Sequence, residues 1–393
     1  MDHNDRVIHD FLAARLKRNA PFVLFREPGE SDFKSYFADE NETLRARTPA
    51  ALLKSPDARD GFLFAPFSAN RHPLLFLPAV RRANTKAQLL ALINTEALSS
   101  SATTDVSDEV SPLDKADLSL YDEASAKAAY LDVFSKMKAM LSSGSCRKIV
   151  LSRQKTLALS DGFLPFAVFE RALTRYPDAM VSVFFHPLTG LWIGSTPEVL
   201  LKARSSSTRA EAETVALAGT MPLAPETDLP ALSAWSHKNR EEQAYVTDYL
   251  RETIARHGRL VSETGPRTVR AGSLCHLKTD LRLTMDADCD ALCRLIDDLH
   301  PTPAVCGLPK ATAFRTLLEE EGVDRRWYSG YLGPVDFKDT ALPDTRLYVN
   351  LRTFSVDGPT VTFYAGGGLV EESESTDEWL ETEYKMQTMM RTL

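Results

Sequence analysis

The chain has 393 residues, of which 44% are hydrophobic, 25% charged and 9% aromatic, the composition of a globular protein of one to three domains. Lys and Arg number 46 and Asp and Glu 54, which gives a net charge of −8. An acidic chain without a long basic run is poorly suited to nucleic acid or anionic lipid, so we expect neither as a partner. No segment approaches the roughly 20 apolar residues that cross a bilayer, and residues 1–18 lack the apolar core of a signal peptide.

Cysteine usage indicates a reducing compartment. The five cysteines are odd in number, and no two are spaced as a CxxC pair. This pattern is typical of free thiols and argues against a disulfide framework or a zinc site. We therefore expect a cytoplasmic protein whose fold depends on an apolar core, which a chain of this length can form without cross-links.

The first 120 residues predict one helix and a few short strands. An apolar stripe over 6–18 predicts the helix, and apolar runs at 21–25, 62–67 and 74–80 predict the strands. Residues 99–119 are rich in Ser, Thr and Asp and have almost no periodic apolar positions, which is typical of a linker.

From residue 121 onward, predicted helices alternate with predicted hairpins, which favours an α+β fold with mainly antiparallel sheets over a repeated βαβ unit. The helices are expected at about 130–141, from 165, at 237–257, 289–299 and 310–321, and from 376 to the end. The strands are expected at 148–159, 179–186, 191–193, 198–203, 214–218, 346–354 and 360–365, with a polar loop at 204–213.

One acid lies on the apolar stripe of the predicted helix 237–257. Glu242 precedes Val246 by one turn, so its side chain is expected on the inward face near the start of the helix. The structural alternative is an acid that stabilises the helix dipole from its first turn.

The last helix carries a second acidic face. Glu378, Glu381 and Lys385 are spaced i, i+3 and i+7, which places them together. A Ser375–Glu378 capping box and a Glu381–Lys385 ion pair would explain them structurally. The functional alternative is a Mg²⁺ site, since carboxylates without nearby His or Cys suit a hard cation.

Five further features have both a structural and a functional interpretation. Gly366–Gly368 end a strand, where bare N–H groups can approach an anion, although such a run is usually a turn. Lys148 fits an edge lysine, Glu198 an exposed turn acid, Arg352 a surface residue beside Asn350 on one strand face, and His276 a hydrogen-bonded core histidine. None of these residues identifies a function alone.

The order of these residues along the chain is more informative. From 148 to the C-terminus the sequence resembles the chorismate-utilising enzymes, a family that includes isochorismate, salicylate, anthranilate and aminodeoxychorismate synthases. The matching segments are KIVLSR (148–153), GSTPE (194–198), LAGT (217–220), KNREEQAYVTDYL (238–250), HLKT (276–279), HPTPAVCGLPK (300–310), SGYLGPVD (329–336), YVNLR (348–352) and GGGLVEESESTDEWLETEYK (366–385). The resemblance implies one large α+β domain of stacked, mainly antiparallel sheets with outer helices. Residues 1–120 would be its variable N-terminal part and 121–393 its chorismate-binding catalytic core, so the linker would not divide two domains.

The resemblance also implies roles for single residues. Lys148 matches the general base and Glu198 the general acid. Gln243 stands where the family usually has His. The acids that match the ligands of Mg²⁺, which in turn holds the ring carboxylate of chorismate, are Glu242, Glu378 and Glu381. The positions that match substrate contacts are Gly219, His276, Arg352, Gly366, Gly367, Gly368 and Lys385.

Two positions distinguish the reactions of the family. Members that use ammonia resemble one another in having Gln where this chain has Lys148, and aminodeoxychorismate synthases have a nucleophilic lysine where it has Ala218. The resemblance therefore implies water as the nucleophile. The expected enzyme is an isomerase, an isochorismate synthase, that adds water at C2 of chorismate and releases the C4 hydroxyl without a glutamine amidotransferase subunit. Its product would lead to menaquinone or to a siderophore.

Two alternatives stay open from the sequence. A salicylate synthase shares this first step and then eliminates pyruvate. A non-catalytic chorismate-binding subunit would need no acid–base pair, so Lys148 and Glu198 together favour an enzyme.

Overall fold

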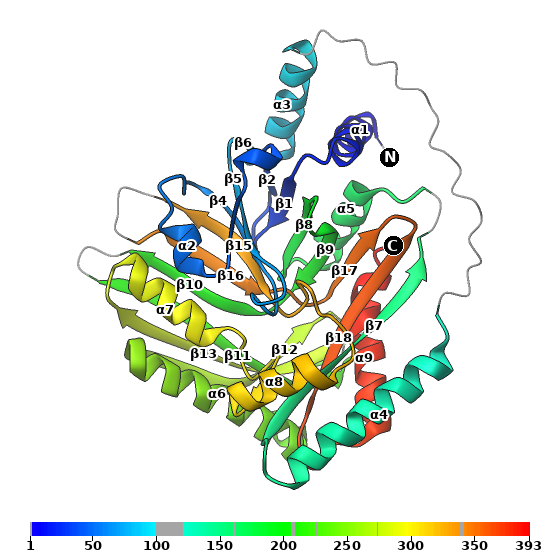
Figure 1. Cartoon of the computed structure of the whole chain (residues 1–393), viewed down its shortest axis with the longest axis vertical. Coiled ribbons are helices and arrows are strands. Elements are labelled where there is room, and N and C mark those ends of the chain that lie inside the picture. Colours follow the sequence, from blue (N-terminus) through cyan, green and yellow to red (C-terminus); the bar gives the residue numbers. More distant parts are fainter. Residues whose placement is uncertain are drawn as a thin grey trace.

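The computed structural model describes residues 2–99, 121–159, 162–205, 209–224, 227–272, 274–337 and 342–393. Most of the predicted linker at 99–119 therefore lies outside the described residues. Two large antiparallel sheets form the centre of the molecule and helices cover them, so the α+β prediction is confirmed (Figure 1). No described helix is long and apolar enough to span a membrane.

The first sheet has nine strands, and its strands come from both halves of the chain. In spatial order they are β14 (Gly307–Leu308), β7 (Lys148–Ala158), β18 (Thr360–Leu369), β17 (Thr353–Asp357), β9 (Gly190–Thr196), β8 (Met180–His186), β1 (Phe22–Arg26), β2 (Lys34–Phe37) and β6 (Arg81–Ala83).

The second sheet also has nine strands and is built in the same way. Its order is β12 (Gly258–Ala271), β13 (Leu274–Met285), β11 (Ala210–Pro222), β10 (Val199–Ser205), β16 (Asp344–Val349), β15 (Tyr331–Asp336), β4 (Gly61–Ala65), β5 (Leu74–Pro78) and β3 (Leu44–Ala46). Strands from residues 22–83 thus belong to both sheets, where they lie beside strands from later parts of the chain.

An aromatic core joins the two sheets. Phe184 of β8 lies 4.3 Å, between ring centroids, from Phe64 of β4, and Trp192 of β9 lies 6.1 Å from the same Phe64 ring. All three side chains are buried. Large aromatic rings that interdigitate in this way bury much apolar area and fix the separation of the sheets.

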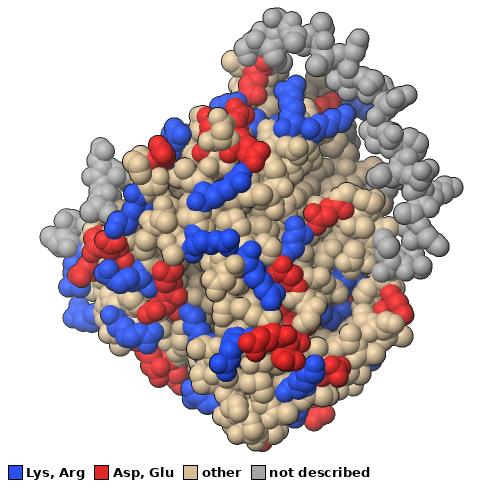
Figure 2. Space-filling view, viewed as in Figure 1, with Lys and Arg blue, Asp and Glu red and all other residues tan. Residues whose placement is uncertain are grey.

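The helices cover the outer faces (Figure 1). Helices α2 (Pro49–Leu53), α6 (His237–His257) and α7 (Cys289–Leu299) pack on the second sheet. The first sheet is covered by α1 (His3–Lys17), α3 (Lys86–Ser99), α5 (Pro165–Arg175) and α9 (Ser375–Met390), and α4 (Glu123–Ser142) and α8 (Lys310–Glu320) pack beside α9 and β7. Two short 3₁₀ turns complete the described elements, at Glu40–Glu42 and Leu232–Ala234. Basic and acidic side chains are interspersed over the face in Figure 2.

The structure corrects three of the predicted elements. Most of the described part of the predicted polar loop at 204–213 belongs to the paired strands β10 and β11. Arg204 and Glu211 face each other across these strands and form a 2.9 Å ion pair. The strand at 346–354 is interrupted, and Arg352 lies between β16 and β17 with a positive φ of 48°. The long β12–β13 hairpin was not predicted, because the exposed edge strand β12 carries no alternating apolar pattern.

A buried ion pair joins β7 to the 300–309 loop, and both segments contribute residues to the candidate site. Arg325 donates to both carboxylate oxygens of Glu321, to the carbonyl of Val150 in β7 and to that of Val305. The Glu321 carboxylate also accepts from the backbone N–H of Ser152. The pair therefore fixes β7 against the 300–309 loop through charged hydrogen bonds.

We expect Glu321→Leu to lower the free energy of unfolding by about 3–5 kcal/mol, because it leaves the Arg325 charge buried and unpaired. The double variant Glu321→Leu/Arg325→Met should regain much of that loss. Urea unfolding measures both. The control is Glu320→Leu on the same helix, where an exposed pair with Lys136 is lost at a cost of about 1 kcal/mol or less. Equal losses in the single and double variants would contradict this role for the pair.

Candidate functional site

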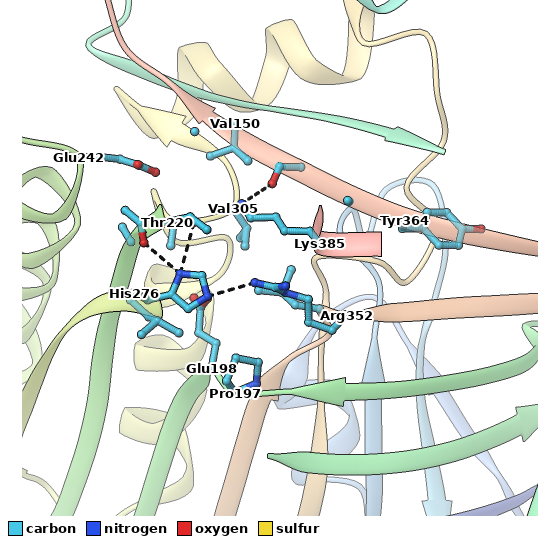
Figure 3. A pocket seen from close by; sticks show the side chains of 18 of the residues that line it. Val150, Pro197, Glu198, Thr220, Glu242, His276, Val305, Arg352, Tyr364 and Lys385 are labelled. Carbon is cyan, nitrogen blue, oxygen red and sulfur yellow. Dashed lines mark hydrogen bonds between the residues drawn. The ribbon is translucent and has the colours of Figure 1, made fainter. Parts of the chain in front are cut away.

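A buried cavity between the two sheets collects most of the predicted site residues (Figure 3). Its volume is about 60 Å³. The predicted residues on its walls are Glu198, Gly219, Glu242, His276, Arg352, Gly366, Gly368 and Lys385. They come from both sheets, α6 and α9, so only the complete fold brings them together.

Lys148 lies at the start of β7 and is fully buried. Strand β14 pairs with it on the outer side, so the edge-lysine interpretation is wrong. Its Nζ lies 3.1 Å from Oε1 of Glu242, yet it has no hydrogen-bond partner among the described residues. An amine in this state has donors, and when neutral a lone pair, available for a small molecule such as water.

Glu198 lies directly after β9 and Pro197, with 3% of its surface exposed, so it is not an exposed turn acid. Its backbone carbonyl accepts from Val349 of β16, which ties this turn to the second sheet. Burial raises the pKa of Glu198 to about 8, although Lys148, Lys385 and Arg352 act in the opposite direction. The carboxyl group is therefore protonated near neutral pH and can donate a proton.

Arg352 and His276 form a hydrogen-bonded chain that ends on Gly219, and Figure 3 shows the bond between Arg352 and His276. The guanidinium of Arg352 is 3.1 Å from Nε2 of His276, and Nδ1 of His276 is 2.9 Å from the carbonyl of Gly219. Because an arginine can only donate, Nε2 is the acceptor and Nδ1 carries the hydrogen. Burial and the nearby Arg352 lower the pKa of His276 to about 3, so the ring is neutral. His276 is thus a hydrogen-bonded core histidine that also lines the cavity, and its contact with substrate stays a prediction.

The three glycines that end β18 make room for the predicted metal ligands. A Cβ atom at Gly367 would lie 2.8 Å from Oε2 of Glu378 and 3.8 Å from Oε1 of Glu381, and one at Gly368 would overlap Glu242. Larger side chains here would therefore displace the carboxylates. The glycine run is a strand that admits three acids, not a turn.

Each of these acids is paired with a lysine. Glu242 pairs with Lys148 at 3.1 Å, Glu381 with Lys385 at 2.6 Å, and Glu378 with Lys238. Lys385 also donates to the carbonyl of Gly366. The predicted Glu381–Lys385 ion pair is thus confirmed, whereas the Ser375–Glu378 capping box is wrong, because α9 begins after Glu374 without a side-chain cap.

The Glu378 carboxylate has capacity for a further ligand. Its Oε1 accepts from Lys238 and Ser373, while Oε2 is buried without a hydrogen-bond partner. Burial and the neighbouring Glu381 raise the pKa of Glu378 to about 7. By contrast, three lysines outweigh burial at Glu242 and lower its pKa. A divalent cation with oxygen ligands fits this donor set.

A different cluster of side chains has its potential metal-ligand atoms closest together. Within the described ranges, His237, Glu241 and Glu372 are the three potential metal ligands whose atoms all lie within 4.8 Å of one another. They lie at the surface, beside Lys238 and Glu242 on α6 and before Glu378 in the chain. The predicted acids Glu242, Glu378 and Glu381 are more widely spaced, and their lysine partners lie among them.

Sequence reasoning missed two residues and left a third undefined. Lys238 lies one turn before Glu242 on α6, a spacing that could have indicated it. Tyr328 lines the cavity beside Gly366 but has no distinctive spacing. Gln243, where the family usually has His, donates to the carbonyl of Ala216 and accepts from the N–H of Ala218, so it fixes α6 to β11.

Comparison with known proteins identifies the family. A family model described as chorismate binding enzyme matches residues 68–393. This chain belongs to the chorismate binding enzymes. The resemblance expected from the nine segments is confirmed.

Several relatives are named isochorismate synthases. The salicylate biosynthesis isochorismate synthase of Pseudomonas aeruginosa is 30% identical over 255 residues, which cover 64% of this chain and 51% of the relative. The isochorismate synthase EntC of Escherichia coli is 27% identical over 272 residues, 67% of this chain and 66% of the relative. The chain thus spans about half to two thirds of the length of these relatives.

Solved structures show the same fold. The menaquinone-specific isochorismate synthase MenF of Escherichia coli aligns with a TM-score of 0.71 and 18% identity over 95% of this chain and 88% of that one. Anthranilate synthase component I of Streptococcus pneumoniae aligns with a TM-score of 0.63 and 16% identity over 95% and 92%. These likenesses establish the architecture.

We expect Glu198→Gln to stabilise the protein increasingly as pH rises from about 4.5 to 8. The folded pKa of Glu198 is about 8 against an ordinary value of 4.5, so over this window the carboxyl ionises in the unfolded state while the folded state keeps it protonated, and the wild type loses stability. The uncharged amide does not. The difference in unfolding free energy, measured by urea denaturation at several pH values, should grow by up to about 1.4 kcal/mol per pH unit. A difference that is constant with pH would show that Glu198 is not protonated in the fold.

Proposed function

We propose that this chain is an isochorismate synthase that converts chorismate to isochorismate. One observation carries the proposal: Glu198, a buried glutamic acid with a pKa of about 8, lines the cavity, and the buried Lys148, whose amine has no hydrogen-bond partner among the described residues, lies 3.1 Å from Glu242 on the wall of the same cavity. Lys148 is near enough to lower the pKa of Glu198. A base for water and an acid for a leaving hydroxyl are the two groups that this isomerisation needs.

The proposed reaction has one bond formed and one broken. Lys148, after it has given up the proton that pairs it with Glu242, accepts a proton from water while the water oxygen bonds to C2. Glu198 gives its proton to the C4 oxygen, which departs as a second water molecule while the ring double bond shifts. The reaction therefore consumes and releases one water, and an isomer results.

The remaining cavity residues would bind the substrate. Arg352 is the buried cation suited to a carboxylate, and its hydrogen bond to neutral His276 holds it in place. Gly219 and the Gly366–Gly368 backbone leave room for a ring. Lys385 lies on the cavity wall with its ammonium group beside Gly366.

Mg²⁺ would be held by Glu242, Glu378 and Glu381. The unpartnered Oε2 of Glu378 and the all-oxygen donor set support this assignment. When bound, the ion supplies positive charge that neutralises a substrate carboxylate. The lysines that pair with these acids keep the site electrically balanced without the ion.

Three wider features belong to the same proposal. The protein would act in the cytoplasm, without a glutamine amidotransferase subunit, because Lys148 replaces the Gln of ammonia-using relatives. Residues 1–120 would form the variable part of the fold and 121–393 its catalytic core. Its product would lead to menaquinone or a siderophore, as the names of its relatives suggest.

Incubation with chorismate and Mg²⁺, followed by chromatography of the products, tests the proposal. Isochorismate should accumulate in equilibrium with chorismate. Salicylate with pyruvate would instead identify a salicylate synthase, and unchanged chorismate a binding subunit.

The Lys148→Ala variant should form isochorismate about 10²–10⁴-fold more slowly, the range for one acid–base group. Lys148→Arg should not restore the rate, because a guanidinium keeps its proton at working pH. Both variants should still bind chorismate, as calorimetry can show. Near-normal turnover in either variant would remove Lys148 from the role of base.

The Glu378→Gln variant should weaken Mg²⁺ binding at least about tenfold, since it removes one charged oxygen ligand. Titration calorimetry with Mg²⁺ measures this without reference to activity. The control is Glu372→Gln in the surface cluster, which should leave the affinity within about twofold. If Glu372→Gln had the larger effect, the ion would bind at the surface cluster instead.

A further inference from the structure

A second cavity, of about 320 Å³, lies beside the candidate active site. It is formed by the segment after α5, by Ser195 at the end of β9, by the end of β12 and by Thr388 of α9. It shares Pro197 and Arg352 with the cavity described above. The two cavities are therefore neighbours that have one guanidinium in common.

The second cavity has an excess of positive charge. Arg175, Arg270 and Arg352 line it, against a single acid, Asp178. In the part of the chain that the structure describes, no carboxylate lies within 4.0 Å of any of the three guanidinium groups. Arg270 instead donates to the carbonyls of Ala224 and Thr227.

The other two arginines likewise have only neutral partners. Arg175 donates to the carbonyl of Arg391, and Arg352 contacts Thr388 and His276. Among the described residues that line the cavity, three guanidinium groups stand against one carboxylate, and this excess of positive charge favours an anion, above all a planar carboxylate.

A buried hydroxyl on the cavity wall also lacks a partner. Ser195 is 3% exposed, and its Oγ makes no hydrogen bond with a described residue. Buried polar atoms are nearly always satisfied, so an isolated hydroxyl beside a cavity indicates a ligand or water. Arg352, itself 8% exposed, lines the same cavity.

The rest of the wall suits a flat apolar body. Tyr176, Pro177, Ala179, Pro197 and Ala271 supply ring and methyl surfaces. A small aliphatic anion would leave this surface uncovered, whereas an aromatic ring would cover it. Arg175 and Arg270 are exposed, so they can attract the ligand from solvent.

We propose that this cavity is a second binding site, for a small aromatic carboxylate. Its carboxylate would be bound by Arg352 and Ser195, and its ring would lie against Tyr176 and the two prolines. Because Arg352 also faces the active site, the ligand and the substrate compete for one guanidinium, and each weakens binding of the other. This coupling rests on the proposed function, whereas binding itself does not.

Benzoate is the probe, titrated by calorimetry into the full-length protein. Wild type should bind it, and benzamide, which lacks the charge, should bind at least tenfold more weakly. The variant Arg175→Gln/Arg270→Gln removes two exposed cations that attract the anion, so it should weaken benzoate binding about threefold and keep the KM for chorismate within twofold. The control Arg259→Gln, an exposed arginine elsewhere on β12, should bind benzoate like wild type.

The same titration with chorismate-saturated Glu198→Gln protein separates a second site from the active site. Benzoate should still bind, several-fold more weakly than without chorismate. Complete competition by chorismate, equal binding of benzamide, or unchanged benzoate affinity in a folded double variant would each overturn the proposal. If the protein did not convert chorismate, benzoate binding and its loss in the double variant would still test the second site.

Discussion

Several charged side chains of this site are buried away from water, and the structure of the site depends on how these charges are paired or neutralised. Glu198, Glu242 and Glu378 are buried with Lys148 and Arg352 in one region between the sheets. An isolated buried charge is strongly unfavourable, so each must be paired or neutralised. The fold does both: Glu242 is held charged by Lys148, whereas Glu198, without an ion-pair partner among the described residues, takes up a proton.

Glu242 is charged and Glu198 is protonated because the backbone fixes each of them, and Lys148, in a different position. Lys148 opens β7, which β14, β18 and the Glu321–Arg325 pair hold on three sides. Glu198 is held by the hydrogen bond of its own carbonyl to Val349 in the opposite sheet. The proposed base and the proposed acid are therefore placed by different sheets, and the aromatic core that joins the sheets sets the distance between them.

The parts of the fold that were predictable are those with a local signal. Helix 237–257 was predicted with its observed bounds, because an apolar stripe marks it; in the structure Ser236 caps its start. The β12–β13 hairpin has no such signal, since exposed edge strands tolerate charge at every position. Ser375–Glu378 was the opposite failure: a correct capping pattern that tertiary contacts overrode, because Glu378 is drawn to Lys238 and Ser373.

The candidate site residues could be predicted from the order of the motifs along the chain, but their burial could not. Nothing in the sequence near Lys148 or Glu198 distinguishes a buried residue from an exposed one. Lys238 escaped notice because its partner, Glu378, lies 140 residues away in the chain. Pairings of this kind depend on the assembled fold, so a family resemblance conveys them while local pattern does not.

The lysine–carboxylate pairs would allow the site to be stable without the proposed ion and still to bind it. The cavity, at about 60 Å³, is too small for a ring with two carboxylates, so substrate binding must move side chains. Long lysine side chains can rotate away at modest cost, whereas the Gly366–Gly368 backbone and the strand ladders cannot. Exchange of two lysine ammonium groups for one divalent cation would keep the charge balanced while it opens space. Helices α6 and α9 hold the three acids in place, and the lysines are the parts able to move.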